Sequence, residues 1–300
     1  MITDRVGFLD CDWTFKFDGG EISPIREITK VRKRVEKLAN PDGFLYAPHS
    51  YRVTLNPRTQ KRRRKVPGSD RPALLHPVPP SHQLDLSEPV NQEELRRGAG
   101  GFLIHLLAYL FGIRLQFHDW WFDSRVPIRM FQTHNIHVRQ STVEDFLSHS
   151  YKTWQKWGPS EQMLMTNVLF MHSRAPSYEW DWERFTIEYM VLDGCWRLAE
   201  LLNGIKGKHH SERIKKLCKK FAIPYEAKRV KRLVTLRNEL FHETLWDSSQ
   251  PCTAVAADTF MKPYDLRRLN QRLIPALLGY DNRYVHTIWW SIGAFQFDNQ

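Results

Sequence analysis

The sequence is poor in cysteine, with only Cys11, Cys195, Cys218 and Cys252 among 300 residues, and no two of them form a CxxC pair. Cysteines scattered in this way argue against a disulfide framework and against a cysteine-only metal site, and they fit a reducing compartment. Cys195 lies in an apolar segment and is expected to pack in the core. We therefore expect a cytoplasmic protein.

Long apolar runs are also missing. No stretch of about 18 apolar residues occurs, and the first residues lack the apolar core of a secretion signal. The sequence predicts no membrane-spanning helix and no membrane partner.

Three common catalytic signatures are absent: the GxxxxGK[ST] phosphate loop, a GxGxxG loop after a strand, and the GxSxG elbow. The 13 histidines invite a metal site, but no HExxH or paired cysteines support one. His134 and His137 have ligand spacing, whereas the adjacent His209 and His210 point to different sides of a helix. We interpret these histidines as surface or loop residues and expect neither a metal nor a cofactor.

Positive charge is what the chain has in excess, because 44 Lys and Arg oppose 33 Asp and Glu, for a net charge of +11. Such a balance makes a polyanion the expected partner, and RNA is the candidate. The charge gathers on a Pro/Gly-bounded segment that is predicted to be a loop and to bind backbone phosphates. Its candidate RNA-binding residues are Arg58, Lys61, Arg62, Arg63, Arg64 and Lys65. A simple solvated loop remains the alternative.

The apolar patterning divides the chain near residue 90. Residues 1–90 carry strand-like segments at Val6–Phe17 and Phe44–Leu55 and a charged helix at Ile25–Ala39, and they end in a proline-rich stretch, Gly68–Pro89, that is typical of a linker. Residues 91–300 are predicted to be mostly helical. The expected fold class is α+β, mainly α-helical, with a helical bundle at the C-terminal end.

Several helices are predicted within the second region. One covers Gln92–Phe111, a capping box at Ser141 opens another that runs to about Trp157, and Ser160 is a candidate cap for a third. A final amphipathic helix is predicted at Tyr264–Leu278. The stretch with the strongest pattern begins at Pro176 and ends at Asn203-Gly204.

This long helix has apolar residues in alternating steps of four and three, which places them on one face. They are Tyr178, Trp182, Phe185, Tyr189, Leu192, Trp196 and Ala199. After a basic linker, a second helix is predicted from about Glu226 to His242. Arg237 lies on its apolar seam with Val230 and Val234, so we expect an acidic group to face it: a carboxylate, a phosphate, or each in turn.

The second helix ends in Arg237-Asn238-Glu239-Leu240-Phe241-His242. This segment resembles the motif of the HEPN superfamily, all-helical domains that include many metal-independent ribonucleases: Arg, often a polar residue, and His after four to six intervening residues. The resemblance covers about residues 176–285. The spacing recurs at Arg71/His76 and Arg129/His134, but only the third copy has Asn after Arg and an amphipathic helix before it. Some toxins of the family are silenced at a Tyr two residues after the His, and Thr244 stands there in this chain.

The resemblance implies an endoribonuclease in a defence or toxin role, with Arg237, Asn238 and His242 as catalytic residues and the RNA 2′-hydroxyl as nucleophile. It also implies a homodimer whose site lies at the two-fold interface. Five residues rotate a helix by about 500°, so we expect either that the helix ends near Phe241 or that two copies share the site.

Three other interpretations remain open. In one, Arg237 forms a buried ion pair with Glu188 or Asp193 while His242 caps its helix. In another, the chain is a non-catalytic module that binds nucleic acid or protein. In the third, it is a purely structural dimer scaffold, which predicts no salt-dependent affinity for nucleic acid.

Overall fold

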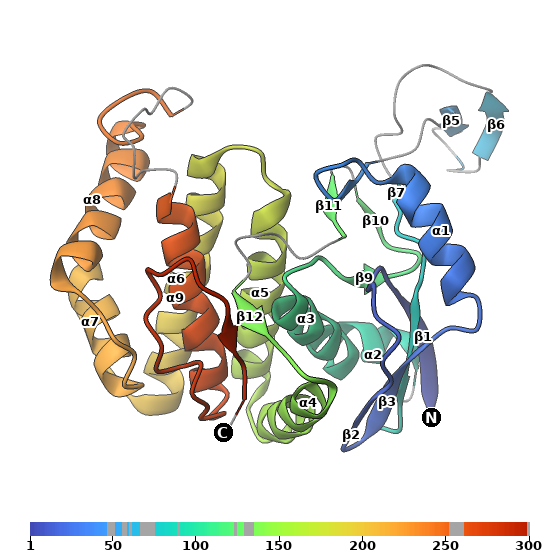
Figure 1. The fold of residues 1–300 in the computed structure, drawn as a ribbon, viewed down its shortest axis with the longest axis horizontal. Helices are drawn as coiled ribbons and strands as arrows, with labels where there is room; N and C mark the ends of the chain where they lie inside the picture. Colours follow the sequence, from blue (N-terminus) through green and yellow to red (C-terminus); the bar gives the residue numbers. More distant parts are fainter. Residues whose placement is uncertain are drawn as a thin grey trace.

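The computed structural model describes residues 1–46, 52–55, 59, 62–66, 76–88, 91–122, 125–128, 135–251 and 261–298. Its fold is α+β and mainly helical, as predicted, with a small sheet near the N-terminus and a bundle of helices beside it (Figure 1). In these residues, no helix combines the length and apolarity needed to cross a bilayer.

A five-stranded antiparallel sheet forms the N-terminal part, in the order β2-β3-β8-β1-β9. Its strands are β1 (Ile2–Gly7), β2 (Phe15–Phe17), β3 (Gly20–Pro24), β8 (His82–Leu86) and β9 (Gln116–Phe117). The interpretation as a linker is wrong for His82–Leu86 within Gly68–Pro89, because these residues form β8, which pairs with β1 on one side and β3 on the other. Leu84 and Leu86 of β8 are fully buried, and this alternation of His82, Leu84 and Leu86 specifies a half-buried strand.

Four short strand pairs complete the β structure. They are β4 (Phe44–Leu45) with β11 (Val126–Pro127), β5 (Arg52–Leu55) with β6 (Arg62–Val66), β7 (His76–Pro77) with β10 (Trp121–Phe122), and β12 (Ile136–His137) with β13 (Phe295–Gln296). The basic run was predicted to be a loop, but Arg62–Lys65 lies in strand β6. The basic residues of β6 are held in an extended strand because its backbone pairs antiparallel with that of β5.

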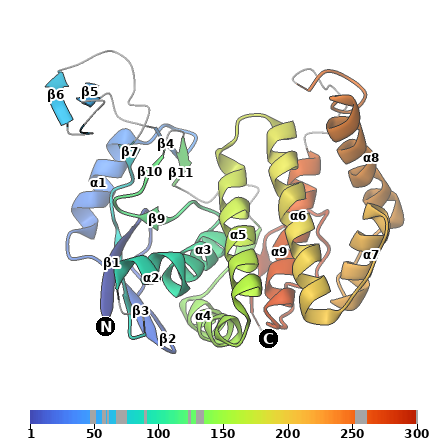
Figure 2. The same cartoon turned by 180° about the vertical axis from the view of Figure 1, so that it is seen from behind.

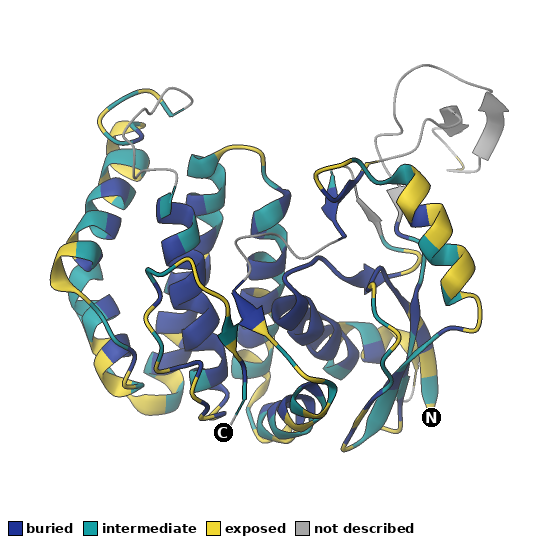
Figure 3. Ribbon diagram, in the orientation of Figure 1, coloured by how far each residue is buried: buried dark blue, intermediate teal, exposed yellow. Residues whose placement is uncertain are grey.

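The helices before the bundle are α1 (Ile28–Leu38), α2 (Gln92–Arg97) and α3 (Ala99–Phe111). The predicted helix at Gln92–Phe111 is thus divided at Gly98, whose backbone leaves the helical region with φ −105° and ψ −126°. From Gly100 to Phe111, α3 is buried on every side (Figure 3). One hydrophobic cluster extends from Val6 of β1 through α3 to Trp289, so the core continues across the predicted domain boundary at residue 90.

The bundle contains α4 (Gln140–Gln155), α5 (Pro159–Arg174), a short 3₁₀ helix (Ala175–Ser177), α6 (Asp181–Asn203), α7 (His210–Lys220), α8 (Ala227–Glu243) and α9 (Lys262–Leu277). Two predicted caps are wrong. Ser141 lies inside α4, which begins at Gln140, and α5 begins at Pro159 after Gly158, so Ser160 is already helical. Proline at the first helical position suits a helix start as well as a capping serine does.

Helix α6 is the predicted long helix, and it packs against α5 and α9 (Figure 2). It ends at Asn203, as expected, with Gly204 at φ +65°. It begins at Asp181 rather than at Pro176, because residues 175–177 form the separate 3₁₀ turn. A Cβ on Gly194 would lie 2.7 Å from Cγ2 of Val168, so glycine here allows the close approach of α5 and α6.

Helix α9 was predicted to be amphipathic and is instead buried on nearly all sides. Its buried arginines form hydrogen bonds inside the protein. Arg267 Nη1 donates to Glu188 Oε1 at 2.7 Å, and Arg272 Nε donates to the Thr287 carbonyl at 2.7 Å. A buried guanidinium is tolerated when its hydrogens are bonded. Sequence periodicity alone assigned these arginines to a solvent-facing side.

Candidate functional site

Helix α8 places the candidate residues. Val230, Leu233 and Leu236 are buried and orient the helix, which packs against α6 and α7. The helix ends at Glu243, where Thr244 adopts φ +58°. With that face held inward, Asn238 and His242 are exposed and Arg237 is half-buried.

Arg237 and His242 meet directly in one chain. Nη1 of Arg237 donates to Nε2 of His242 at 2.8 Å, and the same nitrogen lies 3.2 Å from Oδ1 of Asn238, which also accepts. The structure therefore brings the three predicted catalytic residues together on an accessible surface.

This contact corrects the geometric expectation from the sequence. The helix was predicted either to end near Phe241 or to share its site with a second copy, yet α8 continues to Glu243 and the two side chains still touch. The long side chain of Arg237 spans the angular offset that separates the two Cα positions on the helix. Pairing into a two-fold dimer stays a prediction, but a second copy is not needed to bring Arg237 to His242.

The alternative in which Arg237 forms a buried ion pair with Glu188 is wrong. The Glu188 carboxylate accepts from Arg267, from Nδ2 of Asn270 at 2.8 Å, and contacts Nδ1 of His172 at 2.9 Å. Asp193 lies 3.6 Å from Nδ1 of His210. Among the described residues, no carboxylate forms an ion pair with Arg237.

Aromatic rings surround the Arg237 guanidinium in place of a carboxylate. Its central carbon lies 5.1 Å from the ring centre of Phe241 and 6.0 Å from that of Tyr189. Such faces attract a cation without neutralising it. Its Nε is buried and has no partner among the described residues. The charge of Arg237 thus stays available for an anion.

The structure adds neighbours that the sequence did not indicate. His210, the first residue of α7, lies with its ring 5.6 Å from the Tyr189 ring, and Asp193 of α6 faces it. The segment before α8 had been interpreted as a basic linker, and it contains helix α7 instead. His210 and Asp193 were each considered separately from the sequence, but they were not placed together, since they become neighbours only when α6 and α7 pack against each other.

Charge and burial shift the pKa values of these neighbours. Burial lowers the pKa of His210, and Arg237, Arg213 and His242 act in the same direction, whereas Asp193 opposes them. Burial raises the pKa of Asp193 against the pull of His210 and the two arginines. Burial, with help from Asp193, raises the pKa of Tyr189, so its phenol stays protonated. The electrostatic coupling ties α6, α7 and α8 into one site.

The basic segment is not part of this site. Arg62, Arg63, Arg64 and Lys65 lie in β6, whereas Arg58 and Lys61 lie outside the described residues. Figures 1 and 2 place the β5–β6 hairpin at the opposite end of the molecule from α7 and α8. A single short RNA would not reach both.

Metal-binding geometry is not found in the described part of the chain, which has no group of three or more His, Cys, Asp or Glu able to hold an ion. His134 lies outside it, so the predicted His134/His137 spacing is not described. The same holds for Arg71, Arg129 and His134 of the two other motif copies.

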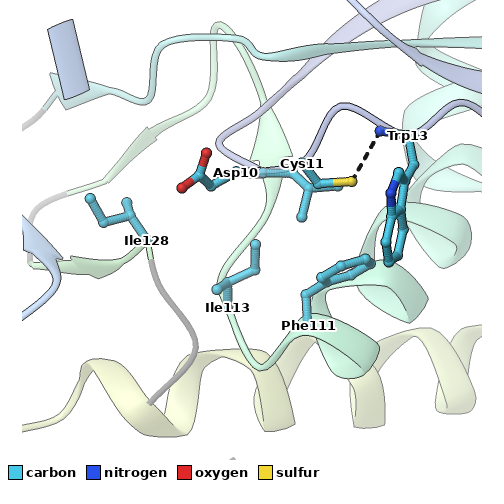
Figure 4. Close-up of a pocket in the computed structure, with 7 residues that line it drawn as sticks. Asp10, Cys11, Trp13, Phe111, Ile113 and Ile128 are labelled. Atoms are coloured by element: carbon cyan, nitrogen blue, oxygen red, sulfur yellow. Dashed lines mark hydrogen bonds between the residues drawn. The ribbon is translucent and has the colours of Figure 1, made fainter. Parts of the chain in front are cut away.

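A separate pocket of about 400 Å³ lies beside the start of the sheet (Figure 4). Its walls are mostly apolar and aromatic; Cys11 lies beside Trp13, and Ile128 lies at the opposite end from Trp13 and Phe111. Burial raises the pKa of the Cys11 thiol to about 11. A thiol with so high a pKa is a poor nucleophile at neutral pH, so this pocket supports no cysteine chemistry.

Comparisons with known proteins add no relative. Searches of protein-family models, curated proteins and solved structures found no match to this chain. The similarity to the HEPN superfamily therefore depends on the Arg237–His242 segment and the helices that carry it.

Proposed function

We propose that the chain is a metal-independent endoribonuclease of HEPN type. The observation that carries the proposal is the 2.8 Å contact between Arg237 Nη1 and His242 Nε2, on a surface where His242 and Asn238 are exposed. A guanidinium and an imidazole in contact at an open surface form a unit that can hold a phosphodiester and move a proton.

The direction of that hydrogen bond assigns a role to Nε2 of His242. Because a guanidinium can only donate, Nε2 is the acceptor in this contact. A neutral imidazole is the form that accepts a proton from the RNA 2′-hydroxyl. A phosphate oxygen that binds Arg237 would compete for Nη1 and free the lone pair of His242 for this task.

Arg237 and Asn238 have the complementary role. Charge grows on the phosphate oxygens as the 2′-oxygen attacks, and a guanidinium beside them stabilises that charge. The Asn238 side chain, 3.2 Å from Arg237, orients the guanidinium or donates to the phosphate. Phe241 is 46% exposed next to Arg237, and an exposed ring of this kind offers a face on which a base stacks.

The test is cleavage of RNA by purified protein in the presence of EDTA. The wild type should leave 2′,3′-cyclic phosphate ends, and His242→Ala should lower the rate by about 10²–10⁴-fold, the range for general acid–base catalysis, while RNA binding survives. His209→Ala is the matched control, since His209 is an exposed histidine on the neighbouring helix start. Equal cleavage by wild type and His242→Ala would refute the assignment.

A second candidate is a binding module without turnover. The net charge of +11 favours this candidate, because it supports the binding of phosphates. The basic strand β6 favours it as well, because it lies remote from His242. A wild type that binds RNA in a salt-dependent way and never cuts it would establish this candidate instead.

The biological setting follows from the chemistry as a further proposal. A ribonuclease in a defence or toxin role acts where cellular RNA is, so we place it in the cytoplasm, as a homodimer. Expression of the wild type should arrest growth of a bacterial host, whereas His242→Ala should not.

A further inference from the structure

We propose that His210, positioned by Asp193, is the second proton-transfer group of the ribonuclease site and acts as the acid opposite His242. The inference rests on the proposed function and extends it to a reaction that needs no second copy of the chain. Three contacts support it: His210 Nδ1 to Asp193 Oδ1 at 3.6 Å, the His210 ring to the Tyr189 ring at 5.6 Å, and the Arg237 guanidinium to the same Tyr189 ring at 6.0 Å.

The Tyr189 ring is a neighbour that His210 and Arg237 share. It is buried between α7 and α8, so His210 approaches it from one helix and Arg237 from the other. The ring centre of Phe241 lies 6.5 Å from that of Tyr189 and 5.1 Å from the central carbon of the Arg237 guanidinium. The two histidines therefore lie on neighbouring helices around one cation-bearing aromatic patch.

The carboxylate of Asp193 lies on the Nδ1 side of the His210 ring, 3.6 Å away. Because Nδ1 faces the carboxylate, Nε2 is left to exchange a proton, and no hydrogen-bond partner occupies Nε2 among the described residues. The side chain of His210 is 25% exposed and that of Asp193 45%. A carboxylate behind an imidazole holds the ring orientation and favours the imidazolium.

The charges facing His210 explain how it becomes an acid when RNA is bound. Asp193 favours the protonated form, whereas Arg213, Arg237 and His242 oppose it. A phosphodiester held by Arg237 brings a negative charge that offsets the opposing cations and favours the protonated form of His210. His210 thus gains its proton with the substrate and can give it to the leaving oxygen.

The reaction balances without another reactant. The 2′-oxygen forms a bond to phosphorus and gives its proton to Nε2 of His242. The bond from phosphorus to the 5′-oxygen breaks, and that oxygen takes the proton from Nε2 of His210. The products are a 2′,3′-cyclic phosphate and a 5′-hydroxyl, and a later proton exchange with water restores both histidines.

The experiment compares two substrates in the same protein sample. An RNA oligonucleotide needs a proton on its leaving oxygen, whereas uridine 3′-(4-nitrophenyl phosphate) releases a stable phenolate without one. His210→Ala should slow cleavage of the oligonucleotide by about 10²–10⁴-fold and cleavage of the nitrophenyl ester far less. Because each ratio comes from one sample, partial unfolding lowers both rates and cancels.

The pH profile and two further variants complete the design. The rate of the wild type on RNA should fall on the alkaline side as the acid loses its proton, and His210→Ala should lose that limb. Asp193→Asn should show the same substrate preference in weaker form, and His209→Ala should behave as the wild type.

The outcomes separate this inference from the proposed function. If His210→Ala cuts the oligonucleotide at the wild-type rate, or loses both substrates equally, His210 is not the acid although the ribonuclease assignment stands. If the wild type cuts neither substrate, both proposals fail together.

Discussion

Neutralising Glu188 should destabilise the protein far more than neutralising an exposed glutamate on the same helix. The Glu188 side chain is 1% exposed and is the carboxylate that balances Arg267, whose side chain is 9% exposed. Glu188→Gln preserves the shape and removes the charge. Breaking a buried ion pair from one side typically lowers the free energy of unfolding by about 3–5 kcal/mol, because an uncompensated charge remains inside.

That loss corresponds to a fall in melting temperature of roughly 6–20 °C at about 2–4 °C per kcal/mol. Glu200→Gln is the control, since Glu200 pairs with Arg197 near the surface, at side-chain exposures of 28% and 62%. Such a pair is worth about 0–1 kcal/mol. Chemical denaturation at neutral pH measures both variants.

A second pair of variants isolates the interaction. Arg267→Met alone leaves Glu188 without its cation, whereas the double variant removes both charges. The double variant should lower the free energy of unfolding by less than the sum of the two single variants. The expected difference is about 0.5–3 kcal/mol, the range for residues in direct contact. Equal losses in Glu188→Gln and Glu200→Gln, together with additive double-variant losses, would refute the reasoning.

The pH dependence gives an independent check with a definite sign. Burial raises the pKa of Glu188, but His172 and Arg267 outweigh it and hold the pKa below its ordinary value. A depressed carboxyl pKa contributes stability that is present above the ordinary pKa of about 4.3 and is lost as pH falls below it. The difference between wild type and Glu188→Gln should therefore be largest near neutral pH and should shrink as the pH falls below about 4.3.

Four further results are expected. Gly194→Ala should lower stability by about 1–3 kcal/mol because its Cβ would meet Val168, and adding Val168→Ala should recover part of it in the same denaturation assay. Burial lowers the pKa of His105 to about 3. Below about pH 6.5 the unfolded chain therefore binds a proton at this histidine that the folded chain does not bind, and the free energy of unfolding falls as the pH falls. His105→Leu should reduce the slope of that fall by up to about 1.4 kcal/mol per pH unit. Replacing Arg62–Lys65 by alanine should reduce the salt slope of RNA binding by about 0.7 for each RNA phosphate that these side chains neutralise in the wild type, with cleavage of a dinucleotide unchanged. Specific activity on a dinucleotide should not fall on dilution, since Arg237 meets His242 within one chain; a steep fall would return the site to a dimer interface.

The sequence predicted best where local periodicity and chain punctuation agree. The end of α6 at Asn203, the start of α8 after Glu226 and the buried face of α6 all follow from apolar steps of three and four with Gly204 behind them. Within α6, however, two further apolar residues, Met190 and Leu201, are exposed. Periodicity locates the centre of a buried face more reliably than its edges.

Long-range pairing explains what the sequence missed. Strand β8 lies in a proline-rich stretch, and only its partners β1 and β3 make it a central strand. Helix α7 has so many lysines that its buried residues Ile214, Leu217 and Cys218 did not stand out. The sequence also did not show that His210 lies beside Asp193, because the two residues become neighbours only when helices α6 and α7 pack against each other.

The arginines of this chain differ in what their guanidinium groups bind. Arg267 and Arg272 are buried and bonded to a carboxylate, backbone carbonyls and a hydroxyl, so their hydrogens are committed to the fold. Arg237 is only half-buried, and its hydrogen bonds go to the side chains of Asn238 and His242 rather than to a carboxylate. A guanidinium that keeps its full charge next to an exposed imidazole contributes little to stability that a neutral residue would not, and it attracts an anion strongly. This contrast is the physical reason to look for the function of the protein at the end of α8 rather than in its buried charge network.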